Sequence, residues 1–292
     1  MSIRLRAAGM FMRIAFKRQL NSDFDPIAAR RRFVKQRLVG RTVELNGICF
    51  EQRGPEAASN IILYFHGGGF IFGIDDSHRR FVDLLCRRTN SRGWILDYPL
   101  APENPFPAAR DDAAAALGYL LAQQGSGRVT IVADSAGGAL ALGAALAHRG
   151  ASRRVDRMVL MSPLADCAMT ALSYVYNRGR DPMFGPEAII HKAHHYLNGA
   201  NPTDPSASPL WADLRGLPPT QIFVGSTEVM LDDSTRLADK ARAAGCDVEL
   251  HIVPNAPHVF PLLFPWSAEA RSAVEAMTEF AIGERTKAAV AR

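Results

Sequence analysis

A serine at an expected sharp turn is the residue of this sequence best placed for covalent chemistry. Ser135 follows the apolar run VTIVAD and precedes GGALALGAALA, which predicts a strand, a tight turn and a helix. Such a turn projects a serine hydroxyl towards a base and makes it a nucleophile. Gly137 supplies the small residue required after the serine, whereas Ala133 stands where glycine is usual before it. Taken alone, the segment is also compatible with a serine that caps a helix.

A base and an acid for this serine are expected after later strands. The chain has eight histidines, and His258 in NAPHVFPL is the one that follows the last expected strand. The acid should precede it in GSTEVMLDD at 225–233, where Glu228 is the first choice and Asp232 the reserve. Asp232 is also explained as a carboxylate at a helix start, and Glu228 has no such explanation. Ser135, Glu228 and His258 therefore form a candidate triad for acyl transfer.

The segment HGGGF at 66–70 directly follows the short apolar run IILYF. Three glycines allow backbone N–H groups to face an incoming carbonyl oxygen without side-chain obstruction, which predicts an oxyanion hole. A dinucleotide-binding loop would need glycine three residues after Gly69, and that position is Phe72. We therefore interpret this loop as an oxyanion loop.

The elements that position these residues alternate between strands and helices. Edge strands are expected within 42–54. Further strands are expected at 61–65, at 94–100, directly before Ser135, and at 157–163, 220–226 and 247–254. Helices are expected over about 108–123, 186–197 and 267–283. This order predicts an α/β fold with a mostly parallel central sheet flanked by helices. Because 167–215 interrupts the alternation, we expect N-terminal cap helices over 1–45 and a catalytic domain over 46–292, with 167–215 as a cap insertion.

Composition narrows the class of protein. The chain has 292 residues, of which 48% are hydrophobic, and no stretch of it approaches eighteen uncharged apolar residues, which argues against a transmembrane helix. The N-terminus lacks an adequate signal-peptide core, so we expect it to be retained. Four scattered cysteines without a C-x-x-C pair fit free thiols in the cytoplasm. His191, His194 and His195 have helical spacing, but without an H-E-x-x-H pattern we expect no metal site.

Residues 1–40 are strongly basic, with ten Lys or Arg against two Asp. Contact with nucleic acid or an anionic membrane surface is one interpretation, and it predicts salt-dependent binding. A solvated face of short amphipathic helices is the interpretation that we prefer. We therefore expect no nucleic-acid partner and no stable membrane insertion, and a homodimer stays open.

Five blocks occur in an order that is typical of one family: HGGGF, DYPLAPENPFPAARDD at 97–112, DSAGG, SPLAD at 162–166 and PHVF. Over about residues 45–285 the chain resembles the hormone-sensitive-lipase family of α/β-hydrolases, the bacterial family IV esterases. This resemblance implies a serine carboxylesterase with a helical cap that needs no cofactor and hydrolyses small-molecule esters of short-to-medium acyl chains. It also implies Ser135 as the nucleophile and His258 as the base. The implied oxyanion donors are the N–H groups of Gly68, Gly69 and Ala136.

Other positions are less settled by the resemblance. Phe70 and Asp134 are the predicted substrate-binding residues, although Asp134 also suits a bracing carboxylate. The sequence departs from the family pattern at Ala133, at Pro99 in place of arginine, and at Glu228 in place of the more frequent aspartate. The same groups could cleave a lactone or an amide. A non-catalytic ligand-binding protein on this fold is the other alternative, and the presence of His258 argues against it.

Overall fold

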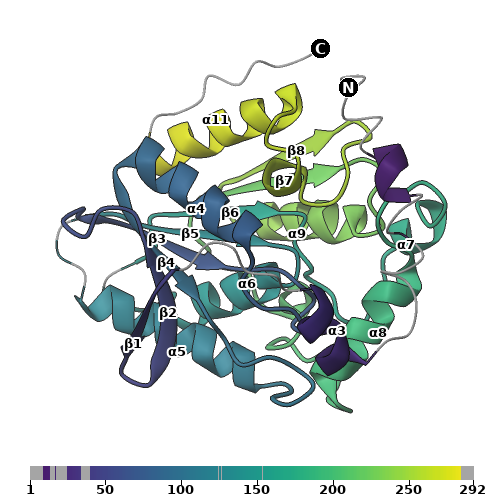
Figure 1. The fold of residues 1–292 in the computed structure, drawn as a ribbon, viewed down its shortest axis with the longest axis horizontal. Helices are drawn as coiled ribbons and strands as arrows, with labels where there is room; N and C mark the ends of the chain where they lie inside the picture. The colour runs from purple at the N-terminus through teal and green to yellow at the C-terminus, as the bar shows by residue number, and fades with distance from the viewer. Residues whose placement is uncertain are drawn as a thin grey trace.

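A mixed sheet of eight strands runs through the centre of the molecule (Figure 1) in the order β1-β2-β4-β3-β5-β6-β7-β8. The computed structural model describes residues 9–13, 17, 25–33, 40–123, 125, 127–152 and 154–283. The strands are β1 (Arg41–Leu45), β2 (Ile48–Arg53), β3 (Asn60–Phe65), β4 (Ser91–Leu96), β5 (Val129–Asp134), β6 (Arg157–Met161), β7 (Thr220–Gly225) and β8 (Val248–Val253). Pairs β1–β2 and β2–β4 are antiparallel, and all later neighbours are parallel.

The central strands are apolar on both faces because helices cover both faces. All six residues of β5 are buried, and β3 has only Asn60 partly exposed. Continuous runs of Ile, Leu and Val are typical of strands in the interior of parallel sheets. The carboxyl ends of β3, β5, β7 and β8 consequently reach one edge of the sheet, and the expected chemical groups follow these ends.

Two hydrophobic layers hold the helices on the sheet (Figure 1). The helices are α3 (Pro26–Phe33), α4 (Asp76–Thr89), α5 (Ala108–Gln123), α6 (Gly137–Ala147), α7 (Ser173–Tyr176), α8 (Pro186–Leu197), α9 (Leu231–Ala243), α10 (Phe260–Leu263) and α11 (Ala268–Ile282), with a 3-10 turn η1 (Pro209–Trp211). Leu117, Leu140 and Leu237 place α5, α6 and α9 in one layer. Phe81 and Val274 place α4 and α11, together with α10, in the other.

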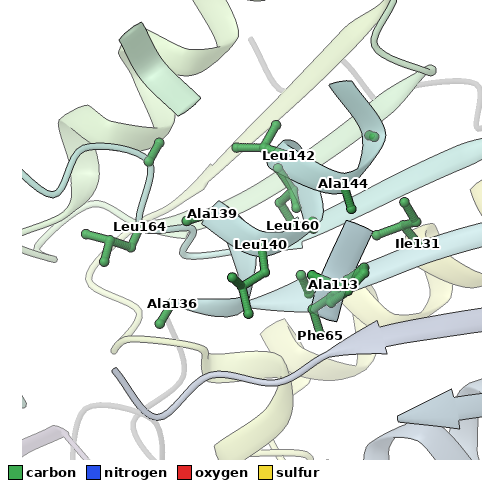
Figure 2. Packing of buried hydrophobic residues seen from close by; sticks show 14 of the residues in the cluster. Phe65, Ala113, Ile131, Ala136, Ala139, Leu140, Leu142, Ala144, Leu160 and Leu164 are labelled. Atoms are coloured by element: carbon green, nitrogen blue, oxygen red, sulfur yellow. The ribbon is translucent and has the colours of Figure 1, made fainter. Parts of the chain in front are cut away.

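Helix α6 packs closely on the sheet because its side chains are small. Figure 2 shows Ala139, Leu140 and Ala144 of this helix among Ile131 of β5 and Leu160 of β6. Alanine side chains let a helix backbone approach a strand, and close packing of this kind maximises dispersion contacts. The start of α6, which follows Ser135, is therefore fixed by the core.

The segment between β6 and β7 carries α7, α8 and η1 outside the alternating pattern. Figure 1 shows α7 and α8 at one side of the molecule, with α3 near α8. Arg30 of α3 forms a bidentate ion pair with Glu103 and donates to the carbonyl oxygen of Ala101 at 2.6 Å. The described N-terminal helix α3 is thereby attached to the proline-rich loop after β4.

The predicted α/β fold is confirmed, and several element bounds differ from the expectation. Strand β4 ends at Leu96, so the expected strand over 94–100 is wrong beyond that residue. Pro99 cannot donate to a strand ladder, which is consistent with this early end. Residues 41–45 form β1, so the sheet begins before the predicted boundary at 46. Helix α4 was not anticipated from the sequence.

Two expectations about the chain as a whole can be compared with the described residues. All four cysteines are free thiols. Within the described ranges, no helix combines the length and the apolar character that crossing a membrane requires. Much of the basic segment 1–40, including residues 1–8, 14–16, 18–24 and 34–39, lies outside the described residues.

Candidate active site

Ser135 occupies the expected turn between β5 and α6. Its backbone has φ of 51°, a left-handed conformation that non-glycine residues rarely adopt. The N–H of Ser135 donates to the carbonyl oxygen of Met161 in the neighbouring strand at 2.9 Å, which anchors the turn. Gly137 is required by close approach, because a Cβ at this position would collide with the carbonyl oxygen of Phe65. Ala133 is fully buried in β5, so the core accommodates its methyl group.

The structure brings Ser135, His258 and Glu228 into one chain of hydrogen bonds. His258 Nε2 lies 3.0 Å from Ser135 Oγ, and His258 Nδ1 lies 2.7 Å from Glu228 Oε2. Glu228 follows the end of β7, and His258 follows the end of β8. Neighbouring parallel strands thus deliver the acid and the base to the same edge of the sheet as the serine.

The second oxygen of Glu228 is held by two donors. Glu228 Oε1 accepts from Ser162 Oγ at 2.8 Å and from the N–H of Gly225 at 2.5 Å. Ser162 Oγ in turn accepts from the N–H of Val259 at 3.1 Å, the residue that follows His258. One serine hydroxyl therefore connects the acid to the loop that carries the base, and this fixes their relative orientation.

His258 is buried, and its charge state is set by two opposing effects. Burial alone would lower the pKa of His258, but the Glu228 carboxylate favours the imidazolium and raises the pKa above its ordinary value of 6.5. The Phe184 ring meets the His258 ring edge to face, with centroids 5.1 Å apart and an interplanar angle of 78°. This site therefore stabilises the imidazolium that forms when a histidine takes a proton from a serine.

Asp181 lies behind the acid and links it to the insertion. Its two carboxylate oxygens accept from the N–H groups of Met183, Phe184 and Val229 at 2.8–3.0 Å. The residue is fully buried, and burial raises the pKa of its carboxyl group. Because Val229 follows Glu228, Asp181 holds the acid loop and the segment before α8 together.

The reserve acid Asp232 has another position. Its carboxylate accepts from the N–H of Ser173 at 2.9 Å and from Tyr176 Oη at 2.7 Å, both in α7. Glu228, and not Asp232, contacts the base. The carboxylate of Asp232 instead fixes the short helix α7 to the start of α9.

The oxyanion loop lies against the serine. A Cβ built on Gly67 would be 3.0 Å from Ser135 Cβ, which places this loop beside the nucleophile. Gly68 and Gly69 have φ of 101° and 65°, so the loop needs glycine at both positions. Among the described residues, the N–H groups of Gly68, Gly69 and Ala136 have no acceptor. They are the three donors predicted from the sequence for an oxyanion.

A buried carboxylate fixes the start of this loop. Asp134 Oδ1 accepts from the N–H of Gly67 at 2.9 Å and from Tyr64 Oη at 2.7 Å. His78 Nε2 lies 3.6 Å from the same oxygen. Burial would raise the pKa of Asp134, but the His78 charge and these hydrogen bonds hold it below its usual value. Burial would likewise lower the pKa of His78, and the Asp134 carboxylate together with Asp75 raises it to about 10.

His66, the first residue of HGGGF, is held as a neutral ring. It stacks on Tyr98 with centroids 4.1 Å apart, and its Nδ1 lies 2.7 Å from the carbonyl oxygen of Gly67. Burial, followed by the nearby His78 charge, lowers the pKa of His66 to about 3. Tyr98 Oη donates to the carbonyl oxygen of His66 at 2.9 Å. Both contacts with Tyr98 fix the start of the loop in addition to Asp134.

The two predicted substrate-binding residues lie among protein groups. Phe70 is 1% exposed and stacks on Tyr196 of α8, with ring centroids 3.7 Å apart. Asp134 is engaged by Tyr64, Gly67 and His78, which agrees with the bracing alternative. Contact with a substrate stays a prediction for both residues.

Of the three histidines of α8, His191 and His195 have facing ring nitrogens, and the His194 ring lies edge to face with that of His195. His191 Nε2 and His195 Nε2 are 3.2 Å apart, and His194 is exposed. Throughout the described part of the chain, no three His, Cys, Asp or Glu side chains are arranged to hold a metal ion.

Three residues that position the site were not identified from the sequence. Ser162 lies in the SPLAD block, but this motif does not indicate its contact with Glu228. Asp181 and His78 belong to no recognised motif, and they reach the site through tertiary contacts alone. The burial of such carboxylates and histidines is a property of the fold that local patterns do not encode.

Similar proteins were found at the level of sequence. A family model described as alpha/beta hydrolase fold matches residues 62–262. An esterase of Acinetobacter venetianus is 35% identical over 245 residues, which cover 82% of this chain and 81% of that protein. An acetyl-hydrolase of Streptomyces hygroscopicus is 39% identical over 232 residues, or 77% of each chain.

Similar solved structures cover nearly the whole chain. An esterase from the bacterial hormone-sensitive lipase family superposes with a TM-score of 0.87 at 33% identity, over 97% of this chain and 99% of that one. The protein EstE5, in crystals soaked with p-nitrophenyl butyrate, gives a TM-score of 0.88 at 32% identity over the same shares.

Proposed function

The chain belongs to the alpha/beta hydrolase fold family, with the bacterial hormone-sensitive-lipase esterases, and we propose that this carboxylic ester hydrolase acts through a Ser135–His258–Glu228 triad. The observation that carries the proposal is the continuous hydrogen-bond chain from Ser135 Oγ through the His258 ring to Glu228. Ester hydrolysis itself is the activity for which the relatives are named.

The first half of the reaction forms an acyl-enzyme. His258 Nε2 takes the proton of Ser135 Oγ as this oxygen attacks the ester carbonyl, and Glu228 stabilises the imidazolium. The N–H groups of Gly68, Gly69 and Ala136 hold the oxyanion, where one such donor contributes about 3–4 kcal/mol in comparable sites. The imidazolium then gives its proton to the alcohol oxygen as the carbon–oxygen bond breaks.

The second half releases the acid. His258 takes a proton from water, and the resulting hydroxide attacks the acyl carbonyl and forms a second oxyanion in the same site. The proton returns to Ser135 Oγ as the carboxylic acid leaves. These steps need only groups of this chain and water.

Short-to-medium acyl esters are the proposed substrates. One relative is named an acetyl-hydrolase, and one similar structure was soaked with p-nitrophenyl butyrate. We further propose that 167–215, with α7 and α8, acts as a cap over the site. The contact of Phe184 with His258 and the stacking of Tyr196 on Phe70 support this role.

The test is a substitution of the nucleophile with a substrate series. Ser135→Ala should lose turnover of p-nitrophenyl esters without loss of the folded state, because nothing else in the site forms the acyl-enzyme. Initial rates with acetate to octanoate esters, one lactone and one amide measure the substrate range. Burst kinetics that survive in Ser135→Ala would refute the triad. Turnover of the lactone or the amide that is faster than turnover of every ester would show that an ester is not the preferred substrate.

A further inference from the structure

Lys192 of α8 is a buried cation that the proposed mechanism does not use. The residue is 7% exposed, and its Nζ donates to the carbonyl oxygen of Ala188 at 3.1 Å. Lysine side chains usually extend far enough for the ammonium to reach water. Here burial lowers the pKa of Lys192 to about 8, so the ammonium form still predominates at pH 7. Desolvated groups of this kind concentrate at functional sites.

Helix α8 places the stem of this lysine on the oxyanion loop. A Cβ at Gly69 would collide with the Lys192 Cδ atom, so the stem lies directly on the Gly69 backbone. One helical turn later, Tyr196 stacks on Phe70. The N–H of Phe106 donates to the carbonyl oxygen of Tyr196 at 2.7 Å. Contacts with two consecutive loop residues therefore fix Lys192 relative to the proposed oxyanion donors.

The ammonium lies one aromatic ring away from the base. Lys192 Nζ is 5.4 Å from the centroid of the Phe184 ring, and the same ring contacts His258. The stem thus touches the loop proposed to hold the oxyanion, and the Phe184 ring contacts both the ammonium and the ring proposed to move the proton. The ammonium is therefore linked to the proposed base through one aromatic ring and to the proposed oxyanion loop through its own stem.

We infer that Lys192 determines specificity, favouring esters that carry a carboxylate within a few bonds of the scissile ester group; the inference rests on the proposed function. A carboxylate of the substrate would form a charge-assisted hydrogen bond with the ammonium, and such bonds strengthen where water is excluded. A neutral ester of the same length gains nothing from this contact. Lys192 therefore sets the ratio of kcat/KM between a charged ester and its neutral counterpart.

The experiment compares matched charged and neutral esters in three proteins: wild type, Lys192→Met and Lys192→Arg. Monomethyl glutarate has a carboxylate in its acyl part, and methyl pentanoate is its neutral counterpart. Butyryloxyacetate has a carboxylate in its alcohol part, and ethyl butyrate is its neutral counterpart. Hydrolysis is followed by acid release at constant pH 7. In at least one pair, the charged-to-neutral ratio of kcat/KM should fall about ten- to hundredfold in Lys192→Met. It should stay within a few-fold of wild type in Lys192→Arg.

The outcomes separate this inference from the proposed function. A lysine that only packs would lower both members of each pair equally in Lys192→Met, and unchanged ratios in both pairs overturn the inference while ester hydrolysis stands. Absence of turnover with every ester in the wild type overturns both proposals. Circular dichroism establishes that the variants are folded, and Lys192→Gln replaces the Met variant if that protein does not fold.

Discussion

Two buried histidine–carboxylate pairs lie near Ser135, and only one of them contacts its hydroxyl. His258 pairs with Glu228, and His78 pairs with Asp134, the residue before Ser135. In both pairs the carboxylate raises the pKa of a histidine whose burial acts in the opposite direction. A raised pKa therefore does not by itself distinguish a catalytic histidine from one that positions its neighbours.

The difference lies in what the second ring nitrogen meets. His258 Nε2 faces Ser135 Oγ, a hydroxyl that can give up its proton. His78 Nδ1 instead lies 3.1 Å from Asp75 Oδ1, so both of its nitrogens face fixed protein groups. Asp134 Oδ1 also faces fixed groups, because Tyr64 Oη and the N–H of Gly67 both donate to it. In the proposed mechanism the first pair passes a proton to a substrate, and the second holds the loop at 66–70.

The largest expected effect is the loss of activity in His258→Gln. Without the base the hydroxyl of Ser135 is a weak nucleophile, and kcat should fall by about ten-thousandfold or more. Steady-state hydrolysis of p-nitrophenyl butyrate measures this fall. The thermal unfolding midpoint provides the control, since the variant should remain folded. Retention of a tenth of the wild-type kcat would contradict the role of His258.

Glu228→Gln should cost about a thousand- to ten-thousandfold in kcat. A neutral amide cannot stabilise the imidazolium. It can also turn either its N–H donor or its carbonyl acceptor towards His258 Nδ1. The pH profile provides a second readout. Because the base must be neutral, wild-type kcat/KM should rise with pH through a pKa above 6.5, and this acidic limb should move to lower pH in Glu228→Gln. An unmoved limb would show that Glu228 does not set the pKa of the base.

His78→Gln should produce the reverse pattern, with a loss of stability and little loss of chemistry. Removal of one partner of a buried pair leaves Asp134 uncompensated, and the free energy of unfolding should fall by about 3 kcal/mol at pH 6. The kcat of the folded variant should stay within about tenfold of wild type. Urea unfolding and p-nitrophenyl butyrate turnover measure the two effects.

The stabilisation from His78 should also depend on pH in a defined direction. The folded-state pKa of about 10 exceeds the ordinary value of 6.5, so the contribution is complete below pH 6.5 and is lost as the pH rises towards 10. The stability difference between wild type and His78→Gln should shrink over this interval. A difference that grows with pH would show that His78 is neutral in the folded protein.

The smallest expected effect is that of Ala133→Gly, which restores the more usual residue before the nucleophile. Ala133 is buried in β5 and lies in register with Phe65 of β3 and Leu160 of β6. Activity should change by less than about threefold, and the unfolding free energy should fall by about 1 kcal/mol, since glycine weakens a strand interior. A tenfold rise in kcat would mean that the methyl group strains the turn at Ser135.

The pair of His258 and Glu228 is predictable from the sequence, and the pair of His78 and Asp134 is not. Ser135, Glu228 and His258 each follow an expected strand, so strand patterns place them at one edge of the sheet before any contact is known. His78 lies in α4, which has a polar exposed face and no strand-end signal, and that helix was missed. Its contact with Asp134 depends on how α4 packs on β3, which is a property of the whole fold.

The acid loop illustrates the same limit. The sequence favours Glu228 over Asp232 because Glu228 lies closer to the end of the strand, and in the structure Glu228 is the one that lies beside His258. The residues that hold Glu228 come from distant segments: Ser162 follows β6, and Asp181 belongs to the insertion. The alternation of strands and helices along the sequence predicts the mostly parallel sheet. The side-chain contacts of Ser162 and Asp181 depend instead on where the loops lie in space.

The rate at which a fluorophosphonate modifies Ser135 tests the central claim most directly. This reaction requires an activated serine hydroxyl and does not depend on which ester the protein prefers. Peptide mass spectrometry locates the adduct in wild type, His258→Gln and His78→Gln. We expect the adduct on Ser135, with a rate in His78→Gln within about tenfold of wild type and a rate in His258→Gln lower by about a thousandfold or more. Modification of another residue, or equal rates in the two histidine variants, would contradict the assignment of His258 as the base and of His78 as a positioning residue.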